Sequence, residues 1–314
     1  MKHLKKALLI MLSMLLIASL SGCSLGLSEQ MTSEELLDAV FDNEEDVDSL
    51  RVDLNLECDI EVDLKDIILS QGLTEKEIED AIESGEIKKE DLNQKIYMAY
   101  GLEVLTDENK SHMTGTMRSE LGEEKEKQKI DRYTSIEDEE IITYDYSDEE
   151  WYKSTSYYDE EEYEEYLSDF IKSFKDSISK SEIVDREGSV YELEIEVDLD
   201  DFDLEEMEDI LYEMDLDDVL TEEVISDIDN IEMLMKIDSK EDRIVGLYID
   251  LEEIIKEALE GYEDTDYSKC VKINKAYIEL EISDYGEVKV KIPKEVLEAE
   301  EEDLDFSVDL DDLF

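Results

Sequence analysis

The most constraining feature of the sequence is an unbroken alternation of apolar and polar residues over Val52–Leu64, "VDLNLECDIEVDL". Apolar side chains or a cysteine occupy every second position, and acidic or amide side chains occupy the positions between them. Successive side chains of a β-strand point to opposite faces of a sheet, so this period of two predicts a strand with one apolar and one solvated face. Such two-faced strands are typical of antiparallel sheets.

The rest of the chain continues this sheet and adds helices. Short polar turns such as "TDENK" and "LGEEKE" separate consecutive strand-like segments, which predicts an antiparallel meander. Strands are expected at 52–64, 95–105, 111–120, 127–136, 141–146, 151–155 and 189–200, and as hairpins at 231–237 with 244–251 and at 272–282 with 287–292. Helices are expected within 32–47, 66–93, 163–178, 204–220 and 252–261, and after Pro293. The predicted fold class is α+β.

Two of these helices have recognisable starts. Thr32 or Ser33 stands before two glutamates, and such a residue can accept hydrogen bonds from the first backbone N–H groups of a helix. Thr74 and Glu77 have the spacing of a capping box, in which each side chain accepts a hydrogen bond from the other residue's backbone N–H. The segment 66–93 is therefore predicted to be a helical excursion between two strands.

The N-terminus predicts export. Three lysines precede a mostly apolar run over residues 7–20, which is shorter than the roughly 20 residues that a membrane-spanning helix needs. The run ends in Leu20-Ser21-Gly22-Cys23, which resembles the lipobox of bacterial lipoproteins, whose cysteine is diacylated. The alternatives are an ordinary signal peptide with an incidental cysteine and an uncleaved anchor helix. Lipidation of Cys23 would attach the protein to the extracytoplasmic face of the cell membrane.

The charge balance excludes several partners. The chain carries 95 acidic and 30 basic residues, a net charge of −65, and loss of the lysine-bearing signal makes the mature charge still more negative. Such a field repels nucleic acid and anionic lipid head groups. The 41% hydrophobic content and 17 tyrosines predict a folded chain in spite of this charge. A salt-rich habitat and an acidic genomic bias are both compatible with it.

Residues able to carry catalysis are few. His112 is the single histidine that remains after signal removal, and the sequence contains no GxSxG, HExxH, CxxC or glycine-rich phosphate loop. Acidic pairs are too numerous to single out a glycosidase or metal site. We expect no enzyme, no cofactor and no dedicated metal site. Cys58 and Cys270 can form one disulfide in an oxidising compartment, and the alternative is two buried, inert thiols.

The order of these elements resembles the LolA/LppX-like group of envelope lipoproteins, especially uncharacterised Gram-positive members. The resemblance rests on the lipobox Leu20–Cys23, the helix-then-strand opening Glu34–Leu64, "YDYSDEEWYK" (Tyr144–Lys153) and "ISDYGEVKVKIPKEVLEA" (Ile282–Ala299). It implies a strongly curved antiparallel sheet, or half-open barrel, with helices packed on its concave apolar face. Lipid or a lipidated protein would bind between them.

The chain is accordingly divided into four parts. Residues 1–22 are the predicted signal peptide, 23–30 the lipidated tether, 31–299 a single LolA/LppX-like domain with a helical insertion near 66–93, and 300–314 an acidic tail. An uptake-system binding subunit is disfavoured, because the sequence lacks the alternating βα order of such proteins.

The functional expectation is binding of a lipid or other amphiphile in an apolar cavity of several hundred Å³. The candidate lining residues are Leu54, Leu56, Ile60, Met98, Tyr100, Met113, Tyr144, Tyr146 and Trp151. The alternative is a cell-surface interaction or structural module with a filled core, whose acidic face and tail meet an envelope protein or cell-wall component.

Overall fold

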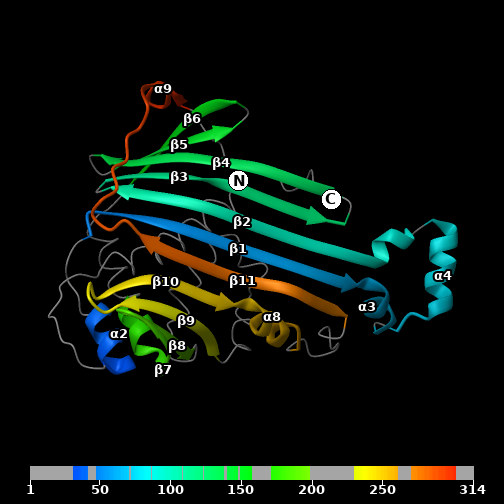
Figure 1. The fold of residues 1–314 in the computed structure, drawn as a ribbon. Coiled ribbons are helices and arrows are strands. Elements are labelled where there is room, and N and C mark those ends of the chain that lie inside the picture. The colour runs from blue at the N-terminus through cyan, green and yellow to red at the C-terminus, as the bar shows by residue number, and fades with distance from the viewer. Residues whose placement is uncertain are drawn as a thin grey trace.

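The fold is built around one large sheet. A computed structural model describes residues 31–41, 47–70, 72–85, 87–107, 109–122, 124–137, 140–147, 149–157, 171–198, 230–260 and 270–301. The strands are β1 (Ser49–Asp63), β2 (Asn93–Asp107), β3 (Lys110–Leu121), β4 (Glu124–Glu137), β5 (Glu140–Ser147), β6 (Glu150–Tyr157), β7 (Ile178–Glu187), β8 (Val190–Asp198), β9 (Asn230–Asp238), β10 (Arg243–Asp250), β11 (Val271–Ser283) and β12 (Glu300–Glu301). Their order across the sheet is β12-β6-β5-β4-β3-β2-β1-β11-β10-β9-β8-β7 (Figure 1).

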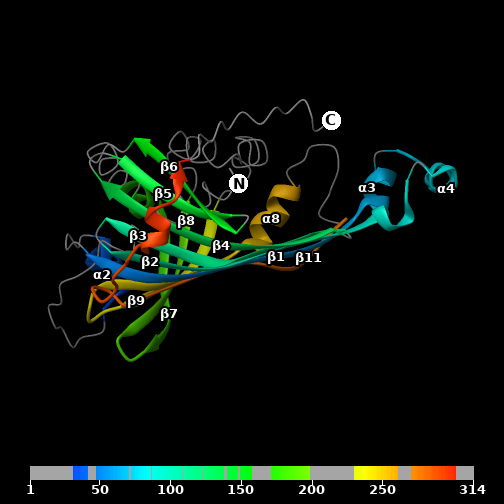
Figure 2. The same ribbon diagram turned by 90° about the horizontal axis from the view of Figure 1, so that it is seen from above.

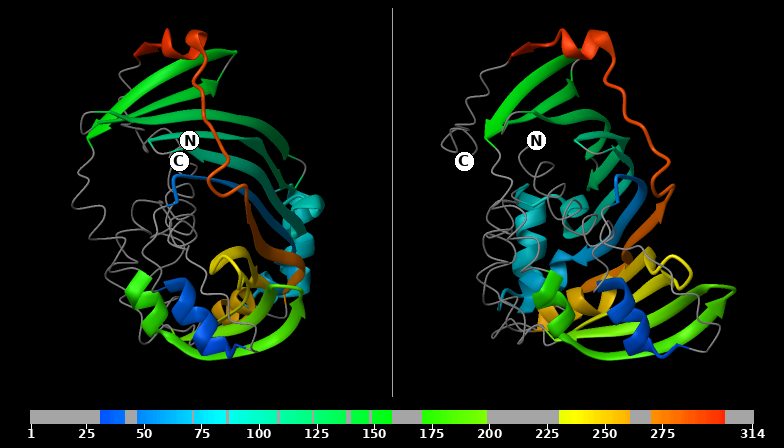
Figure 3. Two further views of the ribbon diagram at one scale, coloured as in Figure 1. Left: turned by 60° about the vertical axis from the view of Figure 1, so that its left-hand side comes forward. Right: turned by 90° about the vertical axis from the view of Figure 1, so that its left-hand side faces the viewer.

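The sheet is strongly curved and does not close on itself. All neighbouring strands are antiparallel except β12, which pairs in parallel with β6. Seen along the strands, it curls from β6 through β1 and β11 to β7 and encloses a concave face (Figure 3). The described edges, β7 and β12, lie at the two ends of the strand order. The predicted α+β class with a half-open barrel is therefore confirmed.

Helix α2 (Ser33–Phe41) packs inside the curve. Thr32 caps it, since the Thr32 hydroxyl accepts from the backbone N–H of Glu35 (3.2 Å) and the Glu35 carboxylate accepts from the Thr32 N–H (2.8 Å). Its apolar face belongs to one core with side chains of β1, β2 and β8–β10. Core residues under 3% exposed include Leu36, Val40, Leu50, Val52, Leu193, Ile195, Met235 and Ile237. The concave face of the sheet is thus the apolar face.

The connection between β1 and β2 is helical and stands at the far tip of the long strands (Figures 1 and 2). It consists of α3 (Leu64–Ser70), α4 (Glu75–Ser84) and a 3₁₀ turn, η1 (Lys89–Leu92). Both hydrogen bonds of the predicted capping box between Thr74 and Glu77 are present, and Gly85 ends α4 in the left-handed conformation at φ 80°. The predicted helical character of this segment is confirmed.

The predicted hairpin of residues 272–282 with 287–292 is wrong. Residues 271–283 form β11, but β1 and β10 occupy both of its edges, so no ladder position remains for the following segment. Residues 288–293 instead cross the other, convex face. The backbone N–H of Val288 donates to the Ser49 hydroxyl (3.1 Å), and the backbone N–H of Val290 donates to the Asp107 carboxylate (3.0 Å). Helix α9 (Lys294–Leu297) and β12 follow.

The helix predicted for residues 163–178 ends earlier than expected. Residues 171–176 are helical and Ile178 already begins β7, an edge strand that the sequence pattern did not indicate. Only one neighbour pairs with β7, and most of its side chains are exposed, so it lacks the alternation of a half-buried strand. The predicted helix 204–220, the signal and tether of residues 1–30, and the tail beyond Glu301 lie outside the described residues.

In the described residues, no helix combines the length and apolar character required to cross a membrane.

Candidate functional site

Strand register determines which predicted cavity residues share a face. Side chains of directly paired residues lie on the same side of an antiparallel sheet. Leu54 pairs with Leu102, Leu56 with Tyr100, Cys58 with Met98 and Ile60 with Ile96. Across the next ladder, Tyr100 pairs with Met117, Ile96 with Leu121 and Val104 with Met113. Six candidates therefore lie on the concave face: Leu54, Leu56, Ile60, Met98, Tyr100 and Met113.

The side chains on this face become more exposed along the strands, away from the core. Leu54 and Met113 are buried in the core, whereas Met98 is 37% exposed and its neighbours Ile96 and Leu121 are 38% and 60% exposed. We call the outer part of the face the apolar stripe. It comprises Leu56, Cys58, Ile60, Ile96, Met98, Tyr100, Met117 and Leu121. Sequence reasoning missed Ile96, Met117 and Leu121, because only the register reveals that they line up with the candidates on β1.

The aromatic candidates Tyr144, Tyr146 and Trp151 lie on the opposite, convex face. Tyr144 pairs with Tyr133 and Tyr133 with His112, and these side chains alternate with the concave Arg132 and Met113. Tyr146 pairs with Trp151. A shift of one residue along a strand moves a side chain to the other face, so these three aromatics cannot line one cavity with Leu54 or Met98. The single cavity predicted from all nine residues is therefore wrong.

On the convex face the aromatics form a cluster of their own. The rings of His112 and Tyr133 are stacked with centroids 3.9 Å apart, and Trp151 lies 5.7 Å from Tyr133 and 5.2 Å from Tyr146. Cross-strand aromatic pairs of this kind stabilise a sheet. Tyr144 beside them is 5% exposed. These contacts indicate that the aromatic side chains pack against one another across adjacent strands of the meander.

His112 is engaged by an acidic partner. Its Nε2 lies 3.1 Å from Oδ1 of Asp131, and Nζ of Lys129 donates to Oδ2 of the same carboxylate at 2.8 Å. Burial raises the pKa of Asp131, but the hydrogen bonds from Lys129 and His112 outweigh burial and hold it below its ordinary value. The carboxylate thus stays ionised between two donors.

The two cysteines form no disulfide with each other. The Asp63 N–H donates to the carbonyl of Cys270 (2.7 Å), so Cys270 lies beside Asp63. Asp63 is five residues along β1 from Cys58. That offset is about 16 Å at the rise of a strand, far beyond the roughly 4 Å between β-carbons of a disulfide. Of the two alternatives, separate thiols are present. Burial, with the charge of Asp59, raises the pKa of the Cys58 thiol.

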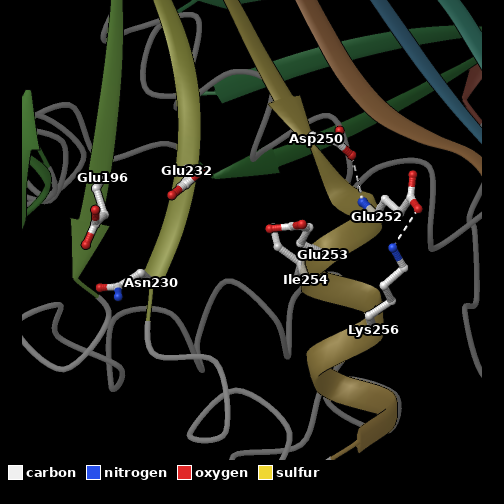
Figure 4. A pocket seen from close by; sticks show the side chains of 8 residues that line it. All are labelled: Glu196, Asn230, Glu232, Asp250, Glu252, Glu253, Ile254 and Lys256. Atoms are coloured by element: carbon white, nitrogen blue, oxygen red, sulfur yellow. Dashed lines mark hydrogen bonds and ion pairs between the residues drawn. The ribbon is translucent and has the colours of Figure 1, made fainter. Parts of the chain in front are cut away.

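A hollow of about 510 Å³ lies beside α8 (Leu251–Glu260), where β8 and β10 end and β9 begins. Its lining is acidic, with Glu196 directly opposite Glu232 on adjacent strands and Glu253 on the side of α8 turned toward β9 (Figure 4). Lys256 is bound to Glu252, at 2.6 Å. Hollows of about 500 and about 210 Å³ on the convex face are also lined mainly by polar residues. Among the described residues, no group of three or more histidine, cysteine or acidic side chains is arranged to hold a metal ion.

Comparison with known proteins gives one similarity to report. No protein-family profile and no curated protein matches the sequence. The crystal structure of LprF from Mycobacterium bovis is similar to this chain with a TM-score of 0.36 and 9% sequence identity, over 84% of this chain and 96% of LprF.

Proposed function

We propose that this protein is a non-catalytic lipoprotein that binds a lipid or other amphiphile on its concave sheet. The observation that carries the proposal is the apolar stripe, where Ile96, Met98 and Leu121 remain 38%, 37% and 60% exposed. Contiguous exposed apolar side chains mark interaction sites in soluble domains. Methionine adds a flexible, polarisable surface that adapts to irregular partners.

The size of the stripe favours an acyl chain over a protein partner. From Met117 to Leu121 it extends four residues along β3, which is about 14 Å, and it spans β1 to β3, which is about 10 Å. The resulting patch of roughly 140 Å² is small beside the roughly 800 Å² that each partner contributes to a standard protein interface. A hydrocarbon chain lying along the strands matches its length.

The absence of catalysis is part of the proposal. His112 is hydrogen-bonded to Asp131 on the convex face, and Cys58 lies on the concave face. The sheet therefore separates the imidazole from this thiol, so the two do not form the base–nucleophile pair of a cysteine hydrolase.

Anchoring through lipidated Cys23 at the extracytoplasmic face is proposed from the lipobox alone. A diacylated Cys23 would keep the stripe close to a source of amphiphile. Replacing Cys23 by Ala is expected to abolish incorporation of labelled fatty acid and to leave the protein unprocessed. Unchanged labelling would remove the anchoring part of the proposal while leaving the binding part intact.

The test of binding is mass spectrometry of an organic extract of the protein purified from a bacterial envelope. We expect a stoichiometric lipid that is reduced at least about tenfold by Leu121→Glu or Met98→Lys, because each places a charge on the stripe. Leu73→Glu is the matched control: Leu73 is 44% exposed, like Leu121, but precedes α4 at the far tip.

Three results separate the two accounts of function. If the stripe variants lose the lipid and L73E keeps it, the result supports lipid binding on the apolar stripe. Equal loss from all three variants would contradict the assignment to the stripe. An extract that contains no lipid, even after incubation with envelope lipids, would favour the alternative of an interaction module with a filled core.

A further inference from the structure

Arg132 in β4 differs from the other charged residues that the structure describes. Among the charged side chains that the structure describes, only Arg132 is buried, with its side chain 8% exposed. It pairs with Met113 on β3 and with Asp145 on β5, so its side chain lies on the concave face. Met113 and Ile130, two neighbours on that face, are 2% and 4% exposed.

Among the described residues, most N–H donors of Arg132 have no acceptor. A guanidinium has five N–H donors in a rigid fork and cannot lose its charge. Nε donates to the Asp145 carboxylate, which is partly exposed, and within the described part of the chain neither Nη atom makes a hydrogen bond. Burying donors of a charged group without acceptors is costly. The two Nη atoms therefore require an acceptor that this part of the chain does not supply.

Arg132 shares the concave face with hydroxyl side chains on one side and with the apolar stripe on the other. One row away on the same face, about 7 Å along the strands, Ser111, Thr134 and Thr143 pair across β3, β4 and β5 and supply hydroxyl donors. In the other direction along β3, Met117 and Leu121 lie four and eight residues from Met113, or about 14 and 27 Å.

We infer that the ligand is an anionic amphiphile whose phosphate or carboxylate group binds the two Nη atoms of Arg132. The planar fork of arginine fits both groups through two parallel hydrogen bonds. The hydrocarbon part then extends along β3 over Met117 toward Leu121. This inference rests on the proposed function and adds the chemical class of the ligand and the residue that selects it.

The negative net charge of the protein opposes the binding of an anionic ligand. A protein of charge −65 repels anions and attracts cations over its whole surface. Overall electrostatics therefore predicts that a cationic amphiphile binds best and an anionic one worst. Preference for the anionic amphiphile requires a local arrangement of donors such as that around Arg132.

The test uses residues 23–314 with Cys23→Ser, which keep every described residue. Calorimetric titration compares dodecyl phosphate with dodecyl maltoside, dodecyltrimethylammonium and inorganic phosphate, below the concentrations at which the amphiphiles form micelles. We expect dodecyl phosphate to bind one to one and at least about tenfold more tightly than each of the others. R132Q should remove this preference, by about tenfold to a hundredfold, and leave dodecyl maltoside binding unchanged. R118Q, an exposed arginine on the convex face of β3, is the matched control.

Each other outcome overturns a defined statement. Equal binding of the phosphate and maltoside amphiphiles, unaffected by R132Q, overturns the anionic class and leaves the proposed function standing. Inorganic phosphate binding as tightly as dodecyl phosphate overturns the lipid as the source of the anion. If no amphiphile binds, the proposed function itself fails. Should R132Q not fold, R132Q/D145N replaces the ion pair by two neutral amides and is expected to show the same loss.

Discussion

Gly115 in β3 lies directly opposite Leu102 in β2, and the two strands approach so closely there that no larger residue fits. A β-carbon at position 115 would stand 2.6 Å from Cδ2 of Leu102 and 2.2 Å from the carbonyl oxygen of Gly101. Gly115→Ala is therefore expected to lower the free energy of unfolding by about 1–3 kcal/mol, the usual cost of overpacking a core. Urea denaturation with an unchanged m-value measures this loss.

Gly101→Ala is the control for the same strand pair. A β-carbon at position 101 would meet only Oδ1 of Asn55, at the ordinary contact distance of 3.8 Å. We expect a change within about 0.5 kcal/mol, as for most surface substitutions. Equal losses in G115A and G101A would show that the need for glycine in β3 is not steric.

Asp131 is expected to make stability depend on pH. Its pKa is held below the ordinary value in the folded protein, so the stability it adds is complete above the pKa of an unfolded aspartate, about 3.9. That stability is lost as the pH falls through the lower folded pKa. Asp131→Asn should lower the free energy of unfolding by about 1 kcal/mol near pH 7, because Lys129 and His112 lose their charged acceptor.

Removing any acidic group also reduces the self-repulsion of the chain, which requires a control for charge alone. Glu126→Gln changes an exposed glutamate on the same strand by the same charge. Chemical denaturation of D131N and E126Q at about pH 7 and about pH 3 compares the two. A D131N deficit that persists undiminished at the lower pH would show that the carboxylate charge is not its cause.

Glu196 and Glu232 stand directly opposite each other beside the acidic hollow. Like charges across a strand pair are destabilising, so Glu232→Gln is expected to raise stability by about 0.5 kcal/mol. The gain should be larger at about 0.01 M salt, where charges act over about 30 Å, than at about 1 M. Thermal unfolding at both salt concentrations measures it.

Glu192 supplies the matched comparison, four residues from Glu196 along β8. It pairs with Lys236 across the same two strands, with an N–O distance of 3.7 Å. Glu192→Gln removes the same charge together with an attraction, so we expect no gain at low salt. If E192Q stabilised as much as E232Q, the effect would belong to the net charge and not to the facing carboxylates.

Much of this architecture follows from local patterns, and the rest depends on which strands become neighbours. The alternation over Val52–Leu64 predicts β1 because one of its faces is buried, and the Thr74–Glu77 spacing predicts α4 because a capping box is local. The segment 287–292 has the same strand-like pattern but fails to pair, since β1 and β10 already flank β11. Local periodicity does not encode whether an edge is free.

The residues of the candidate site also fall into those that a local pattern predicts and those that only strand pairing determines. The pattern places Leu54, Leu56 and Ile60 on one face of β1, but it does not determine which face of β5 or β6 joins them. The ladder register assigns Tyr144 and Trp151 to the convex side and Arg132 to the concave side. Arg132 was missed because in a strand rich in lysine and glutamate a single arginine has no local signature.

Cys58 provides a direct reporter of ligand on the concave face. It pairs with Met98 within the apolar stripe, and burial raises its thiol pKa, so its alkylation is already slow. An amphiphile bound on the stripe covers the sulfur, and we expect dodecyl maltoside, which binds without Arg132, to slow alkylation of Cys58 at least about fivefold, by the fraction of protein occupied. Mass spectrometry of the alkylated peptides follows Cys58 separately from Cys270.

In the control, Cys58→Ser with Asn55→Cys, the reactive thiol sits at an exposed position on the convex face of the same strand. Slowing at residue 58 but not at residue 55 places the ligand on the concave face, whereas equal slowing would mean that the amphiphile acts on the reagent or on the whole protein.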